Sequence, residues 1–256
     1  ADKILLYIHG IIGDTESILP SVLAKTNSDG DETLQDKYDL VLAFDYENLN
    51  TTIQDNGKLL KERLQEVGIS ANHGKQLDIV AHSMGGLVSR CFIEEEGGNQ
   101  IVQHLVMLGT PNAGSPWAKI QDWAFTALGI GLNHLSSVVW GSNIIAAFLA
   151  FLEANDNALD QMRIQSDFIQ GIAKNKDPKV QYTIIAGDRS IGQEGLDVEG
   201  NSSQIKRLMQ KLFGSAVSLE RYPQPRIVSP IACDHLTYFT SEAGLDALVK
   251  ALSSDL

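Results

Sequence analysis

Residues Ala81 to Gly86 read AHSMGG and follow the apolar run QLDIV at 76–80. A nucleophilic serine on a sharp strand-to-helix turn needs small residues two places before and two places after it, because larger side chains would strike neighbouring elements. Ala81 and Gly85 meet this need, with Ala in place of the more usual Gly. We therefore predict that Ser83 is a nucleophile and not an ordinary serine beside two flexible glycines.

A serine that attacks a carbonyl carbon also needs donors for the oxyanion that forms, each contributing on the order of 3 kcal/mol. In sites of this kind one donor is the amide after the nucleophile, here Met84, and the other comes from a loop after a strand. The stretch YIHGIIGD ends a strand-like run with His9 and Gly10 and offers the amide of Ile11 as the second donor. We expect His9 to be a structural ring in that turn.

The general base is expected after the last strand, because such sites follow the chain order serine, acid, histidine. The stretch IACDHLTYF places His235 between a strand and the final helix. His82 adjoins the serine and is expected to point away from it. The remaining histidines fit no catalytic position: His73, His104 and His134.

Three carboxylates are open as the acid that orients this histidine. Asp188 directly follows the strand-like run VQYTIIAG, which is the usual place for such an acid. Asp197 lies further along the same segment, and Glu220 lies near the end of AVSLERY. Asp234 adjoins His235 and cannot easily reach its far nitrogen. We take Asp188 as the first candidate, with Asp197 and Glu220 as alternatives.

The elements that position these residues alternate between short apolar runs and longer helical patterns, which is typical of βαβ units and a parallel sheet. The segment 111–178 lies between two predicted strands and is too long for a simple crossover, so we predict an insertion. The 256 residues fit one domain, 1–256. The predicted strands are 3–8, 38–44, 76–81, 101–108, 180–186 and 226–232, and the predicted helices are 52–67, 84–95, 201–213 and 241–253.

Composition narrows the class of partner. A net charge of −12 repels nucleic-acid phosphates and anionic lipid headgroups, so we expect no nucleic-acid partner. The uncharged stretch 123–152 is interrupted by glycines and by Asn, His and Ser, which favours buried or lid-forming helices over a stable membrane span.

Cys91 and Cys233 have no metal-ligand spacing and are expected to be buried. No signal-peptide pattern precedes the first strand, which favours a cytoplasmic location unless such a peptide was trimmed.

The stretches HGIIGD, AHSMGG and LGTPNAGSPWA together resemble the α/β-hydrolases. More closely, they resemble the lipase-like serine esterases, including compact bacterial lipases and the group related to GPI inositol deacylases. The resemblance implies an α/β-hydrolase fold with a mostly parallel six-stranded sheet, helices on both faces and a helical cap. It also implies a Ser-His-Asp triad, hydrolysis of carboxylic esters through an acyl-enzyme on Ser83, and no cofactor or metal.

Many relatives carry the acid of the triad before the last strand, where the corresponding residues 213–217 of this chain include no carboxylate. Either Asp188 takes that role or the triad is incomplete.

The predicted insertion begins at the edge where open α/β sheets bind ligands. We expect its aromatic residues Trp117, Trp140 and Phe148 to form an apolar acyl pocket over Ser83, which favours a small-molecule acyl ester or lipid as substrate. One alternative is an acyltransferase, in which an alcohol or amine takes the acyl group when the cap excludes water. Another is a ligand-binding protein that keeps the fold without the chemistry, because fold alone does not establish function.

Overall fold

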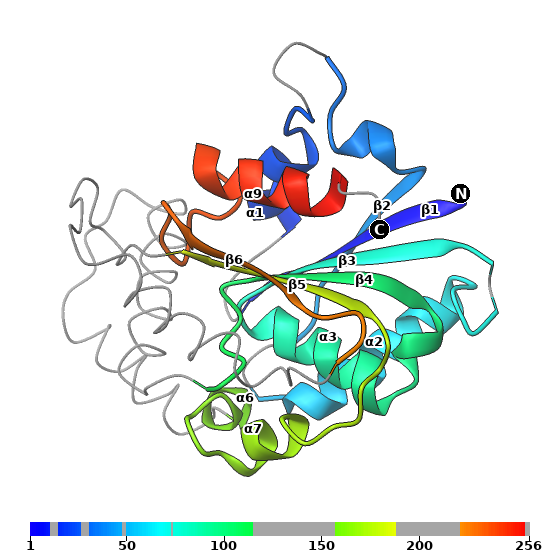
Figure 1. The fold of residues 1–256 in the computed structure, drawn as a ribbon. Coiled ribbons are helices and arrows are strands. Elements are labelled where there is room, and N and C mark those ends of the chain that lie inside the picture. The colour runs from blue at the N-terminus through cyan, green and yellow to red at the C-terminus, as the bar shows by residue number, and fades with distance from the viewer. Residues whose placement is uncertain are drawn as a thin grey trace, which may run out of the picture.

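A six-stranded parallel sheet organises the computed structural model, which describes residues 1–10, 15–26, 31–47, 50–72, 74–114, 157–187 and 221–253 (Figure 1). The strand order is β2-β1-β3-β4-β5-β6, and each neighbouring pair of these strands is parallel. All six predicted strands are confirmed, each within two residues. The strands are β1 (Lys3–Ile8), β2 (Leu40–Phe44), β3 (Gln76–His82), β4 (Val102–Leu108), β5 (Gln181–Gly187) and β6 (Arg226–Ile231).

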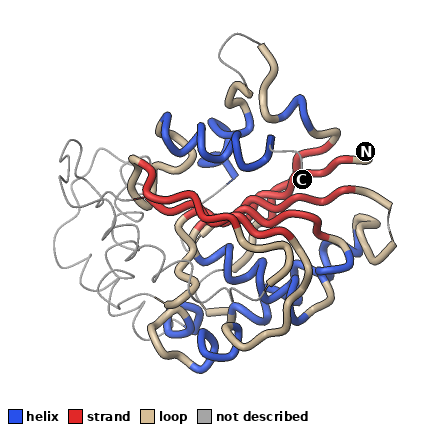
Figure 2. The backbone as a smooth tube through the Cα atoms, in the orientation of Figure 1, coloured by secondary structure: helices blue, strands red, loops and turns tan. Residues whose placement is uncertain are grey.

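The central strands are buried on both faces, which explains why they read as unbroken apolar runs. In β1, Ile4, Leu6 and Ile8 point into one core cluster, whereas Leu5 and Tyr7 point into the cluster on the other face. Helices cover both clusters, as the sequence predicts (Figures 1 and 2). On one face lie α2 (Ile53–Glu66) and α3 (Met84–Glu95), and on the other lie α1 (Thr15–Val22) and α9 (Glu242–Ser253).

Helix boundaries follow local signals closely. The Thr52 side chain caps the start of α2 by accepting a hydrogen bond from the Asp55 amide at 3.1 Å. The predicted helices at 52–67, 84–95 and 241–253 are confirmed, and the one at 201–213 lies outside the described residues. Helix α1, which contains Pro20, was not predicted. Two short 3-10 helices, η1 (Gln35–Lys37) and η2 (Gly98–Gln100), precede β2 and β4.

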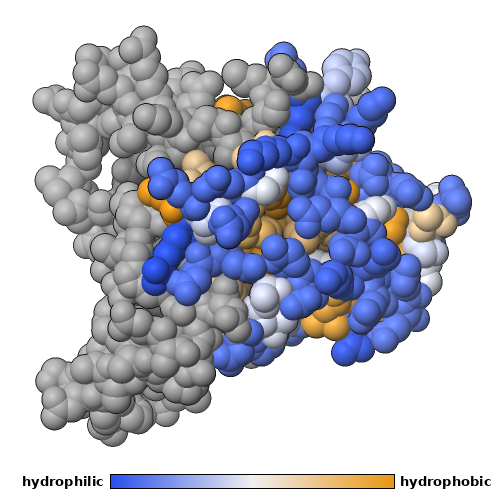
Figure 3. Space-filling view, turned by 90° about the horizontal axis from the view of Figure 1, so that it is seen from below, coloured by the Kyte–Doolittle hydropathy of each residue, from blue (hydrophilic) through white to orange (hydrophobic). Residues whose placement is uncertain are grey.

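The final part of the predicted insertion packs in the main core. Helix α7 (Asp167–Ile172) contacts α3, and its residues Phe168, Ile169 and Ile172 join the cluster beneath the sheet. Helix α6 (Asn157–Gln161) precedes it and contributes buried Ala158. Seen from below, the described outer surface of this side is mainly hydrophilic, as expected of helices whose apolar sides face a sheet (Figure 3). Residues 115–156, which contain most of the predicted cap, lie outside the described part.

A buried network of charges ties α3 to three other segments. Glu94 of α3, whose side chain is fully buried, accepts hydrogen bonds from Arg90 at 2.9 Å and from Arg221 at 2.8 Å. Arg90 also donates to the Asn112 side chain at 3.0 Å and to the Ile172 carbonyl at 3.1 Å. Burial alone would raise the pKa of Glu94, but Arg90 and Arg221 beside it lower the pKa overall. The network therefore fixes the segment after β4, the end of α7 and the segment that begins at Arg221 onto α3.

We predict that Glu94→Gln lowers the free energy of unfolding by ~3–5 kcal/mol, because it leaves two buried guanidinium groups without a carboxylate. The matched control is Glu66→Gln, which breaks the exposed ion pair with Arg63 and should leave the unfolding midpoint unchanged. Urea unfolding at pH 7 measures both. Because the pKa of Glu94 is lowered in the folded state, its ionised form stabilises the protein at pH values above the ordinary pKa range of Glu. The difference in free energy of unfolding between Glu94→Gln and wild type should therefore shrink as the pH is lowered. Equal midpoints for the two variants would contradict this prediction.

Candidate active site

Ser83 lies on a one-residue turn between the last residue of β3 and the first residue of α3. Its backbone has φ 52° and ψ −123°, a conformation that L residues rarely adopt. Such a conformation costs ~1–3 kcal/mol and persists only where the surroundings impose it. Here the Ser83 amide donates to the Leu108 carbonyl at 2.9 Å, and the Ser83 carbonyl accepts from the Gly86 amide at 3.1 Å. The turn is therefore held from β4 on one side and from α3 on the other.

Close backbone packing explains the small residues around this turn. A Cβ at Gly85 would lie 2.3 Å from the His9 carbonyl oxygen and 2.7 Å from that of Ile8. A Cβ at Gly10 would lie 2.9 Å from the Ser83 Cβ. The chain that leaves β1 therefore presses directly against the serine turn. Small residues at these positions are therefore needed for the backbone segments to approach this closely.

The structure brings His235 to Ser83 although 152 positions separate them in the chain. The Nε2 atom of His235 lies 2.9 Å from the Ser83 Oγ, within hydrogen-bond distance. His235 is on the loop after β6, where Asp234 accepts hydrogen bonds from the amides of Leu236 at 2.8 Å and Thr237 at 3.1 Å. The Asp234 side chain thus shapes the turn that carries His235.

Burial lowers the pKa of His235 well below 6.5, and the neighbouring His82 acts in the same direction. The imidazole is therefore neutral at neutral pH. A neutral ring with its Nε2 lone pair toward a hydroxyl can take the proton of that hydroxyl. Ser83 itself is only 2% exposed. The pair has the geometry and the protonation state for a nucleophile and its base.

Two of the other described histidines, His9 and His104, make structural contacts. His9 stacks on Tyr46 with ring centroids 4.6 Å apart, and its Nδ1 lies 2.7 Å from the Gly10 carbonyl. His104 is buried in β4 with its Nε2 2.8 Å from the Thr183 hydroxyl. Burial lowers the pKa of His104 to about 4, so that ring is neutral at neutral pH.

Several predicted site residues lie outside the described part of the chain. Met84 is described: it is the first residue of α3 and is fully buried. Both Cys91 and Cys233 are buried and unbridged, as predicted. The residues not described are Ile11, Asp188, Asp197, Glu220, Trp117, Trp140, Phe148, His73 and His134.

The described stretch 157–187 ends one residue before Asp188, and its last residue, Gly187 of β5, lies against the His235 loop. The Gly187 amide donates to the Tyr238 hydroxyl at 2.7 Å. A Cβ at Gly187 would lie 2.3 Å from the Cys233 carbonyl oxygen. The carboxyl end of β5 is therefore close to the loop that carries His235.

Sequence reasoning missed two residues beside His235. Gly109, at φ +59° after β4, leaves room for the imidazole, because a Cβ there would lie 3.0 Å from the His235 Nδ1. The ring of Tyr238 lies edge-on to the His235 ring, with centroids 6.5 Å apart. A glycine directly after a strand next to the nucleophile strand is the signal that could have pointed to Gly109.

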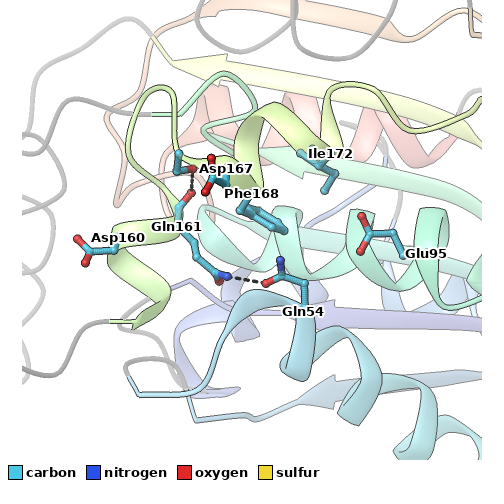
Figure 4. A pocket seen from close by; sticks show the side chains of 9 residues that line it. Gln54, Glu95, Asp160, Gln161, Asp167, Phe168 and Ile172 are labelled. Atoms are coloured by element: carbon cyan, nitrogen blue, oxygen red, sulfur yellow. Dashed lines mark hydrogen bonds between the residues drawn. The ribbon is translucent and has the colours of Figure 1, made fainter.

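Away from this site, a hollow of about 410 Å³ lies between α2, α3, α6 and α7 (Figure 4). Its wall includes the hydrogen-bonded pair Gln54 and Gln161, at 2.6 Å, and the carboxylates of Glu95, Asp160 and Asp167. None of the predicted site residues within the described ranges lines it. Within the described ranges, no three His, Cys, Asp or Glu side chains gather as metal ligands, and no helix is both long and apolar enough to cross a bilayer.

The parallel sheet, with a serine turn after a central strand and a histidine after the last one, defines the α/β-hydrolase fold. Several solved structures share this fold with the chain at low sequence identity. The mature lipase BlEst2 of Bacillus licheniformis is 18% identical, with 98% of this chain and 90% of that chain covered and a TM-score of 0.56. A carboxylesterase of the thaumarchaeon Nitrososphaera gargenis is 14% identical, with 98% and 90% covered and a TM-score of 0.59. A hydrolase from Pseudomonas aeruginosa is 16% identical, with 99% and 91% covered and a TM-score of 0.55.

Residues 1–219 match a family model described as a domain of unknown function, DUF7379, and the chain belongs to this family. No curated protein matches the chain. The predicted α/β-hydrolase fold is confirmed, and lipases and esterases are among the structures that share it.

We predict that Gly85→Ala destabilises the protein by about 1–3 kcal/mol and abolishes reaction of Ser83, because the new methyl group meets rigid backbone. The matched control is Gly171→Ala in α7, where a Cβ meets no atom within 4 Å and a helical alanine should stabilise by about 0.5–1 kcal/mol. Thermal unfolding and labelling with a fluorophosphonate measure the two effects. A Gly85→Ala protein that labels like wild type would show that the close packing is not needed.

Proposed function

We propose that this protein is a serine hydrolase that cleaves carboxylic esters, with Ser83 as nucleophile and His235 as general base. The observation that carries the proposal is the 2.9 Å approach of the His235 Nε2 to the Ser83 Oγ, on a turn held at positive φ. Two such residues, 152 positions apart, meet at the edge of the sheet where open α/β folds bind ligands.

The proposed reaction has two halves. The Ser83 oxygen attacks the acyl carbon while the His235 Nε2 takes its proton, and the same nitrogen then returns that proton to the leaving alcohol. Water attacks the resulting acyl-enzyme, His235 takes a proton from the water, and Ser83 recovers its hydrogen as the carboxylic acid leaves. The lowered pKa of His235 suits the first step, because a neutral ring is the form that accepts the proton.

The amides of Met84 and Ile11 are proposed to bind the oxyanion. The Met84 amide is at the start of α3, where helix N–H groups have no partner within the helix and point outward. The packing of Gly10 against Ser83 supports a role for the next amide in the chain, that of Ile11.

Asp188 is proposed as the acid that orients His235. The support is the position of Gly187, the residue before it, against Cys233 and Tyr238 of the His235 loop. Glu220 is less favoured, because its neighbour Arg221 contacts Tyr182 at the opposite end of β5. The five residue-to-residue steps from Tyr182 to Gly187 span roughly 16 Å of extended strand. No described contact bears on Asp197.

The proposed substrate class is an acyl ester or lipid, and Trp117, Trp140 and Phe148 are proposed to line the acyl pocket. The support is the apolar composition of the insertion and the presence of a lipase and a carboxylesterase among the structures that share the fold.

The test is hydrolysis of p-nitrophenyl esters of increasing chain length by wild type and by Ser83→Ala. The proposal predicts turnover by wild type with an initial burst of p-nitrophenol, as expected of an acyl-enzyme, and none by Ser83→Ala. Turnover that survives in Ser83→Ala would overturn it. Added alcohols separate hydrolysis from acyl transfer, since a transferase would release mainly the transesterified product.

Fluorophosphonate labelling rates identify the acid. We predict that Asp188→Asn slows labelling of Ser83 by at least ~100-fold, because the imidazole loses the group that orients it. Asp197→Asn and Glu220→Gln are the controls and should label like wild type. A slow rate in a control, with a normal rate in Asp188→Asn, would move the acid to that residue.

The pH profile of labelling follows from the His235 environment. Because burial lowers the pKa of His235, the labelling rate should stay constant from pH 8 to below pH 6.5 and fall only at more acid pH, where the ring gains a proton. Labelling rates measured at a series of pH values between 4 and 9 give the pH at which the rate falls to half of its maximum. A midpoint at or above pH 7 would contradict this environment for His235.

A further inference from the structure

His82 connects the nucleophile strand to the loop of the proposed base. It is the last residue of β3 and directly precedes Ser83. Its Nε2 lies 2.7 Å from the backbone carbonyl oxygen of His235. Because a carbonyl oxygen only accepts, the hydrogen of the His82 ring is on Nε2.

The ring of His82 also packs against the segment that follows His235. Its centroid lies 4.9 Å from that of His235, 5.9 Å from that of Tyr238 and 5.8 Å from that of Phe239. On its other side, a Cβ at Gly10 would lie 3.2 Å from the His82 Nδ1. The ring therefore fills the space between the β1 end and the His235 loop.

This contact bears directly on the position of the proposed base. Among the described residues, two hydrogen bonds join the 232–241 loop to the segment formed by β3 and α3: the one to Ser83 and the one from His82. The first joins the reacting atoms themselves, so the second is the one of these two that holds the backbone of His235 to β3. Burial lowers the pKa of His82 to about 4, so its ring stays neutral and its donor stays in place across the working pH range.

We infer that His82 is a positioning residue, whose Nε2–H holds the His235 backbone so that the His235 imidazole meets Ser83. The inference rests on the proposed function of Ser83 and His235. It assigns no proton transfer to His82. A misplacement of about 1 Å at a reacting group costs up to ~100-fold in rate, which sets the expected size of the effect.

The test compares His82→Gln with His82→Asn. The amide nitrogen of Gln lies as many bonds from Cβ as the His Nε2, so it reaches the His235 carbonyl, whereas that of Asn corresponds to Nδ1 and falls short. The inference predicts fluorophosphonate labelling of Ser83 within about threefold of wild type for Gln and a loss of ~10–100-fold for Asn. The loss should appear in the maximal labelling rate and not in the reagent concentration at half-maximal rate. Equal rates for the two variants would overturn it.

A double-mutant cycle separates positioning from a general structural role. If His82 acts through His235, His82→Asn should slow labelling no further in a His235→Ala background. A further loss of similar size there would overturn the inference. His82→Phe, which keeps the ring and removes the donor, replaces His82→Asn if that variant does not fold.

The outcomes distinguish this inference from the proposed function. Wild type that labels at Ser83, with His82→Asn labelling equally fast, rejects the role of His82 alone. Folded wild type that does not label rejects the proposed function and this inference together, because no reaction is left for His82 to act on.

Discussion

The backbone at Ser83 is held in a conformation that it would not adopt alone, and the site depends on what holds it there. Gly10 and Gly85 allow the β1 loop and the first turn of α3 to touch the serine turn, and the Leu108 carbonyl anchors the Ser83 amide. Each contact comes from a different element: β1, α3 and β4. The parallel sheet matters here because it brings the carboxyl ends of neighbouring strands to one edge. The proposed chemistry therefore follows from strand order more than from any single residue.

The same edge receives His235 from the last strand, and the loop that carries it is fixed from several sides. Asp234 closes the turn, Gly187 and Tyr238 join it to β5, and His82 holds it to β3. Further from the edge, Glu94 with Arg90 and Arg221 fixes the segment after β4 to α3. Several contacts therefore hold the loop where the proton transfer is proposed, as preorganised catalysis requires.

Much of this could be predicted from the sequence, for physical reasons. Buried parallel strands appear as apolar runs, so all six strands were found, and the small residues around Ser83 identified the turn. Helix α1 was missed because Pro20 is unusual inside a helix. The packing of Phe168 and Ile172 was missed because an apolar pattern does not say which surface it covers. The acid stayed open because spacing does not show which of three carboxylates reaches the imidazole, and the contact of His82 with His235 depends on a loop 153 residues away.

The central claim is that the His235 imidazole makes Ser83 nucleophilic. The most direct test is treatment of wild type and His235→Ala with a fluorophosphonate, with the adduct located by mass spectrometry of peptides. The account predicts one adduct, on Ser83, formed at least ~100-fold more slowly in His235→Ala. An adduct elsewhere, equal rates in the two proteins, or no adduct in folded wild type would contradict it.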